Sequence, residues 1–594
     1  MNKILIVGGA SFDTLHFFGQ TQQSPGGAGI FTALAARRCG VHAGIFAPHP
    51  HPMPAPLQPI ADRLSWQGPQ VAPDEIPRLE IVHDETGTTY LNTYLGAELT
   101  LDPAQLPPDL SDYSAVHVIS LGSISSQLAF LQECRQRHAP FLSAGANLNG
   151  IQSDPHTTQA ILDIVDAFFL NEPEGIALFG SVEAAQAKPG KLLFLTLGEK
   201  GGRVIQGSVV THLPTLAIEP VDPTGAGDTL CGGTLAFIAQ GYHPIEAARK
   251  AMPQAAETVG VVGPNALLVD TPAPSPPPSP KVTLALAQIE RVASLVATLP
   301  EVSAFDFSGP GYPPVGDPAA LDFFFASTLQ QFGFWTTSDG HYQEPLIAPL
   351  QGQMLKGSSY LSGVYRRAMV EMPAFLTVNG QANISAAQFA TIYRDETGQD
   401  VMPAIDLHLQ LANRYGQDMQ ALGYTPQSLL EEAQNSKRPL QTFLTLLDKI
   451  GGYKEDPLRK KSMLLALILN QRPEKFLTFG PDETPTPVID YHLMRSCLRV
   501  GLIEVQDGAL AAALAARKVI SATDEQVVRR AAYEAIEQIA VFSGKSMGAV
   551  DWFFFGARRR CPEMTEPECA KCALDPICAK RKELFQPVYR TTFY

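Results

Sequence analysis

The stretch VDPTGAGDT occupies residues 221–229 and continues into LCGG, whose small and apolar residues are typical of a helix. Its two glycines let backbone N–H groups turn into one concavity, and the N-terminus of the helix adds partial positive charge. The pattern predicts an anion-binding loop made of Thr224, Gly225, Ala226 and Gly227. Asp228 at its rim can accept the proton of a hydroxyl while the amides hold a phosphoryl group. The alternative is an ordinary glycine turn with Asp228 as a helix cap.

Further stretches in the first 268 residues alternate between strand and helix patterns. The apolar run at residues 4–7 predicts a strand and leads to Gly8-Gly9 and Asp13, and a helical run at 30–40 follows the glycines at 26–29. Strands at 168–170 and 193–197 end in the polar or glycine-bearing segments 171–174 and 198–202. Residues 86–91 are rich in β-branched and aromatic residues and predict a strand and a turn. The alternation indicates an α/β domain with a mainly parallel sheet and helices on both faces.

In their order along the chain, these segments resemble the PfkB (ribokinase-like) family of sugar and nucleoside kinases. The resemblance covers about residues 1–268 and implies a role for each matching residue. Asp13, Gly26 and Gly27 would hold the hydroxyls of the acceptor, Asn171 and Glu174 would help to place Mg²⁺ and the phosphates, and Gly198 to Gly201 would line ATP. Asp228 would be the general base that activates the acceptor hydroxyl for attack on the γ-phosphate. Residues 86–91 fall where this family has a small β lid.

One segment departs from the family pattern. The family often has an asparagine a few residues after the paired glycines, whereas this chain has Ile30-Phe31-Thr32 there. A contact to an acceptor hydroxyl is therefore expected to differ. This difference concerns the identity of the acceptor substrate and does not affect the predicted reaction type.

Composition and charge describe a soluble globular chain of two or three domains. The 594 residues are 45% hydrophobic and 17% charged, with a net charge of −15. No apolar run is long enough to span a membrane and no signal-peptide pattern is present, so we expect a cytoplasmic protein. Residues 1–280 hold 13 Lys and Arg against 25 Asp and Glu, whereas residues 281–594 hold 31 against 34. This balance makes nucleic acid an unexpected partner and lets the second half accept a phosphorylated ligand more readily. The oligomeric state is left open.

A proline-rich segment divides the chain. Residues 271–280 read TPAPSPPPSP, which predicts a semi-rigid spacer at 271–281 between a kinase domain at 1–270 and a second domain at 282–594. The second domain is predicted to be mostly α, with helices at 282–299, 427–447 and 525–542.

Four of the eight cysteines lie together near the C-terminus. Cys561, Cys569, Cys572 and Cys578 follow the spacing C-x7-C-x2-C-x5-C. Four thiolates this close predict a metal loop, either a [4Fe-4S] cluster or a tetrahedral zinc, and spacing alone does not separate the two. Four unligated thiols are the alternative.

The residues around these cysteines resemble the iron-sulfur loop of helix-hairpin-helix DNA glycosylases related to endonuclease III, which has one residue fewer in the first gap. Upstream, residues 488–495 (VIDYHLMR) resemble the segment that carries the catalytic aspartate of that superfamily, and 450–453 with 460–462 resemble a degraded hairpin. By this resemblance Asp490 would stabilise an oxocarbenium-like sugar and orient water. The alternative is that Asp490 caps a helix. Lys461 would be a lyase nucleophile or, as we favour, an exposed basic residue.

A broader resemblance runs from about residue 320 to the C-terminus. Segments 323–325, 333–335, 356–363, 401–403, 490–491 and 589–594 resemble the queuosine salvage protein family, helix-hairpin-helix relatives that hydrolyse queuosine 5′-phosphate. Phe334 and Trp335 would stack on a base, or are core aromatics. The cysteine cluster departs from this family.

Together the two halves suggest a bifunctional salvage enzyme, in which a nucleoside kinase supplies a 5′-phosphate to a fused N-glycosidase. One alternative is a kinase fused to an iron-sulfur DNA glycosylase. The other is a sugar kinase with a non-catalytic binding domain.

Overall fold

The computed structural model describes residues 2–17, 20–84, 87–207, 209–213, 221–269, 281–338 and 340–594. The chain forms two compact units, Met1–Pro277 and Pro278–Tyr594. The predicted spacer at 271–281 lies outside the described residues except for Lys281, and so does Thr86 of the predicted lid strand. The assignment of 271–281 as a spacer therefore stays a prediction.

A nine-stranded sheet forms the centre of the first unit, in the order β15-β14-β13-β12-β11-β10-β1-β4-β6. From β6 to β13 the neighbouring strands are parallel, whereas β14 and β15 are antiparallel additions at one edge. The strands are β1 Lys3–Val7, β4 His42–Phe46, β6 Ser65–Gln67, β10 Ala115–Val118, β11 Leu142–Gly145, β12 Ala167–Asn171, β13 Leu192–Thr196, β14 Gly202–Gln206 and β15 Val209–Leu213. The predicted parallel α/β architecture is confirmed.

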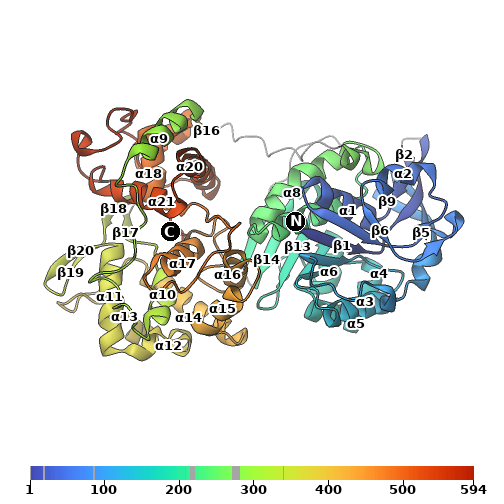
Figure 1. The fold of residues 1–594 in the computed structure, drawn as a ribbon, viewed down its shortest axis with the longest axis horizontal. Coiled ribbons are helices and arrows are strands. Elements are labelled where there is room, and N and C mark those ends of the chain that lie inside the picture. Colours follow the sequence, from blue (N-terminus) through green and yellow to red (C-terminus); the bar gives the residue numbers. More distant parts are fainter. Residues whose placement is uncertain are drawn as a thin grey trace. The chain divides into compact units, whose positions relative to one another are not determined.

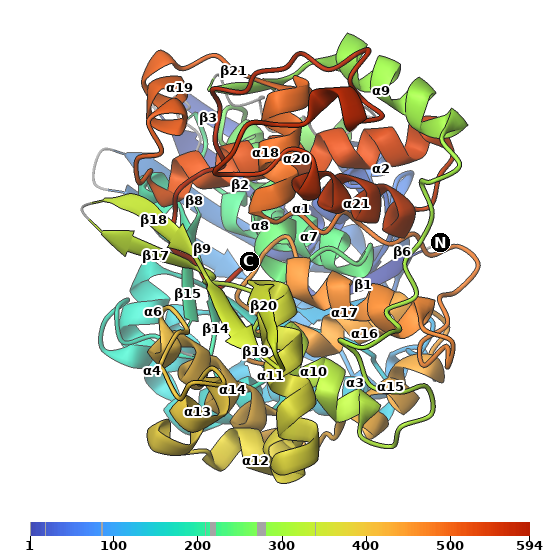
Figure 2. The same cartoon turned by 90° about the vertical axis from the view of Figure 1, so that its left-hand side faces the viewer.

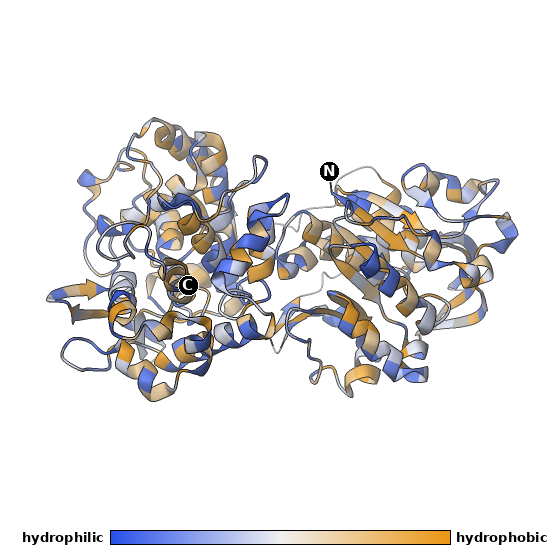
Figure 3. Ribbon diagram, turned by 60° about the horizontal axis from the view of Figure 1, so that its bottom comes forward, coloured by the Kyte–Doolittle hydropathy of each residue, from blue (hydrophilic) through white to orange (hydrophobic). Residues whose placement is uncertain are grey.

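Helices cover both faces of this sheet (Figure 1). The helices α1, α7 and α8 pack against one another on one face, and α3, α4, α5 and α6 lie on the other. Figure 3 shows that the strands between them are predominantly hydrophobic, as expected for a sheet buried on both sides. The helices are α1 Ala28–Arg38, α2 Gln58–Ala61, α3 Ile124–Gln136, α4 Leu148–Ser153, α5 Pro155–Ile164, α6 Glu172–Phe179, α7 Ala226–Ala239 and α8 Pro244–Val259.

A separate four-stranded sheet, β3-β2-β8-β9, contains Asp13 and part of the predicted lid segment. Its strands are β2 Ser11–Phe17, β3 Gln20–Gly26, β8 Arg78–Asp84 and β9 Gly87–Tyr94, and a short pair β5 His49–Pro50 and β7 Gln70–Val71 lies between them in sequence. Asp13 on β2 pairs with Ser24 on β3. Residues 87–91 are thus part of a strand, as the sequence predicts.

The second unit is mostly helical, with three two-stranded sheets. The strands are β16 Val282–Leu284 with β21 Ile503–Val505, β17 Trp335–Ser338 with β18 His341–Pro345, and β19 Ile347–Leu350 with β20 Gln353–Lys356. The helices are α9 Leu286–Thr298, α10 Ala320–Thr328, α11 Ser358–Glu371, α12 Val378–Asn383, α13 Ala386–Tyr393, α14 Ile405–Ala421, α15 Pro426–Gln434, α16 Pro439–Leu447, α17 Lys460–Gln471, α18 Tyr491–Val500, α19 Gly508–Ala515, α20 Ala522–Ser543 and α21 Met547–Gly556.

Two apolar clusters organise these helices. The first joins residues of α10 to α17, and the second joins residues of α9 and α18 to α21. Figure 2 shows α9, α18, α20 and α21 gathered together, and α10 to α14 gathered in another part of the same unit. The two clusters provide the walls of the cavity described below.

The predicted helices of this unit need two corrections. Residues 282–284 form a strand because they pair with 503–505, so the first helix begins only at Leu286. The predicted helix 427–447 is two helices, since Pro439 cannot donate its backbone nitrogen within a helix and stands instead at the first position of α16. The helix predicted at 525–542 is confirmed as α20.

Candidate active sites

The predicted phosphate-site residues gather where the parallel strands end. Asn171 closes β12, Gly198 lies two residues after β13, and Gly8-Gly9 follows β1. The chain moves outward from β1 to β4 on one side and later to β10 on the other, which makes the carboxyl end of β1 a topological switch point. Ligands of open α/β sheets bind at such an edge.

The loop at 224–228 leads into α7, as the sequence predicts. Gly225 is the N-cap of α7 with φ +76°, and a Cβ there would lie 2.4 Å from the ring of Phe31 on α1. Asp222 anchors the loop, because one oxygen accepts from the backbone N–H of Thr224 at 2.9 Å and the other from that of Gly263 at 2.9 Å. Ala226 opens the helix and Gly227 follows.

Gly227 differs from Gly225 in what surrounds it. Within the part of the chain that the structure describes, a Cβ at Gly227 would meet nothing within 4 Å. Packing among these residues does not require a glycine at 227, and its contact with a phosphate stays a prediction.

We expect Gly225→Ala to impair mainly the stability of the protein and Gly227→Ala to impair mainly its activity. Gly225→Ala should lower the free energy of unfolding by about 1–3 kcal/mol through backbone strain and the clash with Phe31. Gly227→Ala should leave stability unchanged or raise it by up to about 1 kcal/mol, because alanine favours the helix. It should nevertheless lower kcat/KM for ATP at least about tenfold, since a methyl group replaces a phosphate contact. Thermal unfolding and steady-state kinetics measure both, and a fully active Gly227→Ala variant would contradict the phosphate role.

Asp228 lies in the first turn of α7, half-buried, and its backbone carbonyl accepts a hydrogen bond from the Thr32 hydroxyl at 3.2 Å. Burial raises the pKa of its carboxyl to about 6. Burial also raises the pKa of Glu174, and the charge of Asp228 adds to that shift. The two carboxyls therefore lie within electrostatic reach of each other.

Asn171 and Glu174 form a capping box at the start of α6. The Asn171 side chain accepts from the Glu174 N–H at 3.0 Å, and Glu174 accepts from the Asn171 N–H at 2.8 Å. The box holds both side chains at the edge where β12 ends. Gly198 and Gly201, predicted to line ATP, both have positive φ values, +59° and +88°, in the turn between β13 and β14.

The predicted acceptor residues lie together in the four-stranded sheet and at the start of α1. Asp13 accepts from the Ser11 hydroxyl and from the Leu79 N–H, each at 3.0 Å, and burial raises its pKa to about 6. Gly26 leaves room for this carboxylate, since a Cβ there would lie 2.0 Å from Asp13 Oδ2. Gly27 is the N-cap of α1 with φ +93°.

Glu98 belongs to the same region, and the motif pattern gave no sign of it. Its buried carboxyl accepts from the Gly9 N–H at 2.8 Å, and burial raises its pKa to about 7. It stands in a short 3₁₀ segment after β9, far from any recognisable motif. Only the fold brings it to the glycine turn after β1.

The second unit contains a cavity of about 580 Å³, built between its two apolar clusters. Aromatic rings form much of its wall, among them Phe305, Tyr312, Phe334, Trp552, Phe555 and Tyr594. Four cationic side chains and three carboxyls also line it, namely Lys356, Lys460, Arg558 and Arg559 with Asp490, Asp551 and Glu563. Apolar rings, cations and carboxyls in one cavity fit a ligand that combines a planar ring with an anionic group.

Asp490 both caps a helix and lines this cavity. Its Oδ1 accepts from the N–H groups of His492 at 2.8 Å and Leu493 at 3.0 Å, so the capping alternative describes a real contact. Burial raises its pKa, while the positive charges of Lys460 and Arg558 and the two N–H donors oppose the shift. The cap fixes one oxygen of the carboxyl in the wall of the cavity.

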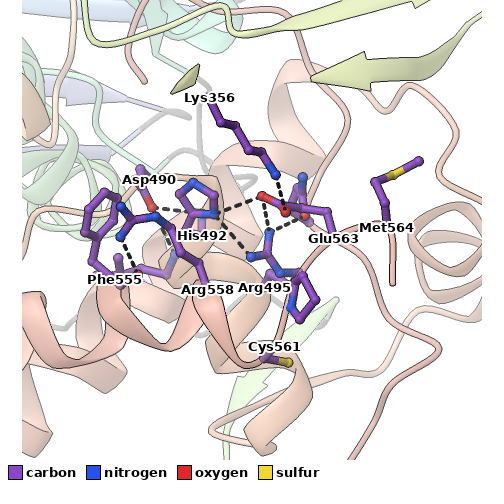
Figure 4. Close-up of polar contacts among 12 residues, drawn as sticks. Lys356, Asp490, His492, Arg495, Phe555, Arg558, Cys561, Glu563 and Met564 are labelled. Carbon is purple, nitrogen blue, oxygen red and sulfur yellow. Dashed lines mark hydrogen bonds and ion pairs between the residues drawn. The ribbon is translucent and has the colours of Figure 1, made fainter. Parts of the chain in front are cut away.

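A network of charged side chains continues from Asp490 along the cavity (Figure 4). Glu563 pairs with Lys356 at 3.0 Å and lies 3.5 Å from the guanidinium of Arg495. Arg495 donates to His492 Nδ1 at 3.1 Å, and burial with the surrounding positive charges holds the pKa of His492 well below its usual range. These surroundings favour the neutral form of His492, although its Nδ1 also lies 3.3 Å from Glu563 Oε1.

The two predicted stacking residues have different positions. Phe334 lines the cavity. Trp335 does not, because its indole stacks on Tyr342 at 5.2 Å and packs edge-on against Phe585. Trp335 is therefore a core aromatic residue, and its predicted role in stacking on a base is wrong. The cavity has another stacked pair, Phe305 and Trp552, with ring centroids 4.1 Å apart.

The basic pair at 460–461 also differs from expectation. Lys461 is buried, 2% exposed, and donates to the Leu329 carbonyl at 2.8 Å, so its assignment as an exposed residue is wrong. Lys460 is the one that lines the cavity. Burial lowers its pKa to about 8, and the charge of Asp490 opposes that shift.

The four cysteines of the C-terminal loop are free thiols, each partly exposed. Burial raises the pKa of Cys578, and the charges of the other three thiols act in the same direction. Two of the sulfurs accept hydrogen bonds. The Arg499 guanidinium donates to Cys561 Sγ at 3.3 Å, and the Lys580 N–H donates to Cys578 Sγ at 3.3 Å. Among the described residues, no three or more His, Cys, Asp or Glu side chains are placed to hold a metal ion. The metal loop stays a prediction.

Comparisons with known proteins match the first unit. The family described as pfkB family carbohydrate kinase matches residues 70–271. A cytidine kinase of Thermococcus kodakarensis is 26% identical over 275 residues, which is 44% of this chain and 96% of that protein. A fructokinase of Klebsiella pneumoniae is 28% identical over 264 residues, 40% of this chain and 84% of that protein. Among solved structures, a probable sugar kinase from Rhizobium etli has a TM-score of 0.40 at 20% identity and covers 46% of this chain and 96% of its own.

The first unit is thus similar to pfkB family carbohydrate kinases over residues 70–271, and this match supports a kinase, a phosphotransferase, on an α/β fold. This family uses ATP and Mg²⁺. Within the residues described, the chain contains no helix with both the length and the apolar character needed to cross a membrane.

Proposed function

We propose that the chain is a bifunctional nucleoside salvage enzyme. The first unit phosphorylates a nucleoside with ATP, and the second hydrolyses the N-glycosidic bond of the resulting 5′-phosphate to release the base. The similarity to a cytidine kinase supports a nucleoside acceptor. The resemblance of residues 320–594 to queuosine salvage proteins makes queuosine the first acceptor to test.

In the kinase unit, each group supports one requirement of phosphoryl transfer. Asp228 accepts the proton of the acceptor hydroxyl as that oxygen attacks the γ-phosphorus. The N–H groups of 225–227 and the positive end of α7 stabilise the charge on the phosphoryl oxygens. Asp13 and the glycine turn at 26–27 position the acceptor. Glu174 and Asn171 would help to hold Mg²⁺, which neutralises negative charge on the phosphates when bound.

In the second unit, the observation that carries the proposal is that Asp490 shares one cavity with aromatic rings and cations. The rings would hold a nucleobase, and the cations would hold a 5′-phosphate. Asp490 would stabilise the positive charge that develops at C1′ as the bond to the base lengthens. The cap contacts orient the carboxylate for this role.

The test is to incubate anaerobically purified protein with queuosine and Mg²⁺, with and without ATP, and to follow nucleoside, nucleotide and free base by mass spectrometry. We expect free base only when ATP is present. Queuosine 5′-phosphate supplied directly should release its base without ATP. Base release from the nucleoside without ATP, or none from the 5′-phosphate, would contradict the sequence of steps.

We also propose that the four cysteines of the C-terminal loop hold a [4Fe-4S] cluster, with zinc as the alternative. The soft sulfur donors and the N–H groups directed at Cys561 and Cys578 fit such a cluster. Metal analysis of anaerobically purified protein should find about four iron ions per chain. The double variant Cys569→Ser, Cys572→Ser should lose them. One zinc per chain would select the alternative, and absence of both metals would contradict the metal loop.

A further inference from the structure

Asp551 is a second buried carboxyl in the cavity of Asp490. It lies on α21, whose sequence MGAVDWFFFG contains no other charged residue. Its side chain is 7% exposed, and it lines the cavity together with its neighbour Trp552. A carboxyl in such apolar surroundings needs a structural or chemical reason, because burying its charge is costly.

The contacts of Asp551 satisfy only one of its two oxygens. Its Oδ2 accepts from the Val488 N–H at 3.0 Å, two residues before Asp490. Its Oδ1 is buried and receives no hydrogen bond from any residue that the structure describes. The same described residues include no cation in an ion pair with it. Among the described residues nothing binds Oδ1, and the side chain that carries it lines the cavity.

Asp490 and Asp551 therefore have contrasting surroundings. Asp490 has two N–H donors and the positive charges of Lys460 and Arg558, all of which favour its ionised form. Asp551 has one N–H donor, and it faces the charge of Asp490 and, on α18, the thiol of Cys497. Burial raises the pKa of Asp551 well above its usual range, and the charge of Asp490 adds to the shift. Two carboxyls in such different environments can divide acid and base roles.

We propose that Asp551 is the proton donor of the second unit, with its free Oδ1 directed to the departing nucleobase and Asp490 acting on the sugar. This inference rests on the proposed glycosidase function. It assigns a role to a residue that no sequence motif indicated.

Asp551, Asp490 and one water molecule supply all the protons that hydrolysis of the C1′–N bond needs. The C1′–N bond breaks and its electron pair goes to the base nitrogen, which takes the proton of the Asp551 carboxyl. A water oxygen bonds to C1′, and its proton goes to the Asp490 carboxylate. The products are the free base and ribose 5-phosphate, and solvent returns the proton from Asp490 to Asp551.

The experiment compares two substrates in wild type and in Asp551→Asn. Asparagine has nearly the same shape but no acidic proton, so release of a nucleobase from a nucleoside 5′-phosphate should fall about 10²–10⁴-fold. A p-nitrophenyl riboside 5′-phosphate carries a leaving group that departs without protonation, and its hydrolysis should fall less than about tenfold. Asp482→Asn, at an exposed aspartate outside the cavity, is the matched control and should leave both rates near those of wild type.

Each other outcome overturns a defined part of this inference. Equal losses on both substrates in a folded Asp551→Asn variant would mean that Asp551 is structural. If the infrared difference spectrum, wild type minus Asp551→Asn at neutral pH, contains no band of a protonated carboxylic acid, Asp551 is also excluded as the holder of the proton. Wild-type protein that hydrolyses neither substrate would instead overturn the glycosidase function itself, and the infrared band would still report whether Asp551 is protonated.

Discussion

Asp228→Asn should lower kcat for phosphorylation of the nucleoside about 10³-fold, while base release from a supplied nucleoside 5′-phosphate stays at the wild-type rate. Asparagine cannot accept the hydroxyl proton, and general base catalysis contributes about 10²–10⁴-fold. Both activities are measured in the same preparation by mass spectrometry. The retained hydrolysis reports that the second unit is folded, and thermal unfolding reports on the first unit. Loss of both activities in a folded variant would mean that the two sites are not independent.

The pH dependence gives a second readout of the same residue. Burial raises the pKa of Asp228 to about 6, and only its ionised form can act as base. The kinase kcat/KM should therefore be level above pH 6 and fall about tenfold per pH unit below it. Asp13 also has a raised pKa of about 6 and contributes to this limb if the acceptor needs its carboxylate. An acid limb that is unchanged in Asp228→Asn would assign it to Asp13 instead.

Asp490→Asn should lower base release about 10³-fold and cause the nucleoside 5′-phosphate to accumulate when nucleoside and ATP are supplied. The substitution separates two roles of one side chain. Asparagine caps helices as well as aspartate does, so α18 should keep its start and the protein its stability. The variant loses the negative charge near C1′ and the acceptor for the proton of water, and electrostatic stabilisation of this kind alone is worth about 10²–10³ in rate.

The capping alternative makes the opposite prediction for this variant. If Asp490 serves only as a cap, Asp490→Asn should release base at the wild-type rate and unfold at the wild-type temperature. Asp490→Ala, which removes cap and charge together, should lose about 1 kcal/mol of stability on either hypothesis. Phosphorylation by Asp490→Asn should be unchanged and provides the internal control.

The placement of the candidate kinase residues on the fold could be predicted from the sequence, because these residues belong to local motifs on an α/β frame. Gly225 to Asp228 enter a helix as the pattern predicts, and Asn171 with Glu174 form a capping box readable from their spacing. Glu98 could not be found this way, since it meets Gly9 only across 89 residues of chain.

The cavity of the second unit was less predictable because, as with Glu98, its residues meet only through long-range contacts. Its cavity joins residues as distant as Phe305, Lys460 and Asp551, and no spacing rule connects them. Pro439 did indicate a helix start, but the amphipathic pattern on both sides hid the break. Neighbours in sequence can also be separated in the fold. Trp335 follows the cavity residue Phe334 but packs in a different apolar cluster.

The contact between Phe31 and Gly225 has a consequence for redesign of the acceptor range. Phe31 lies in the segment 30–32 that departs from the family pattern, and its ring fills the space beside Gly225, where a Cβ would lie 2.4 Å from it. A mutant library that diversifies α1 to admit new nucleosides would therefore also perturb ATP turnover. Such a library should vary positions 31 and 225 jointly and be sorted on phosphorylation rate as well as on acceptor choice.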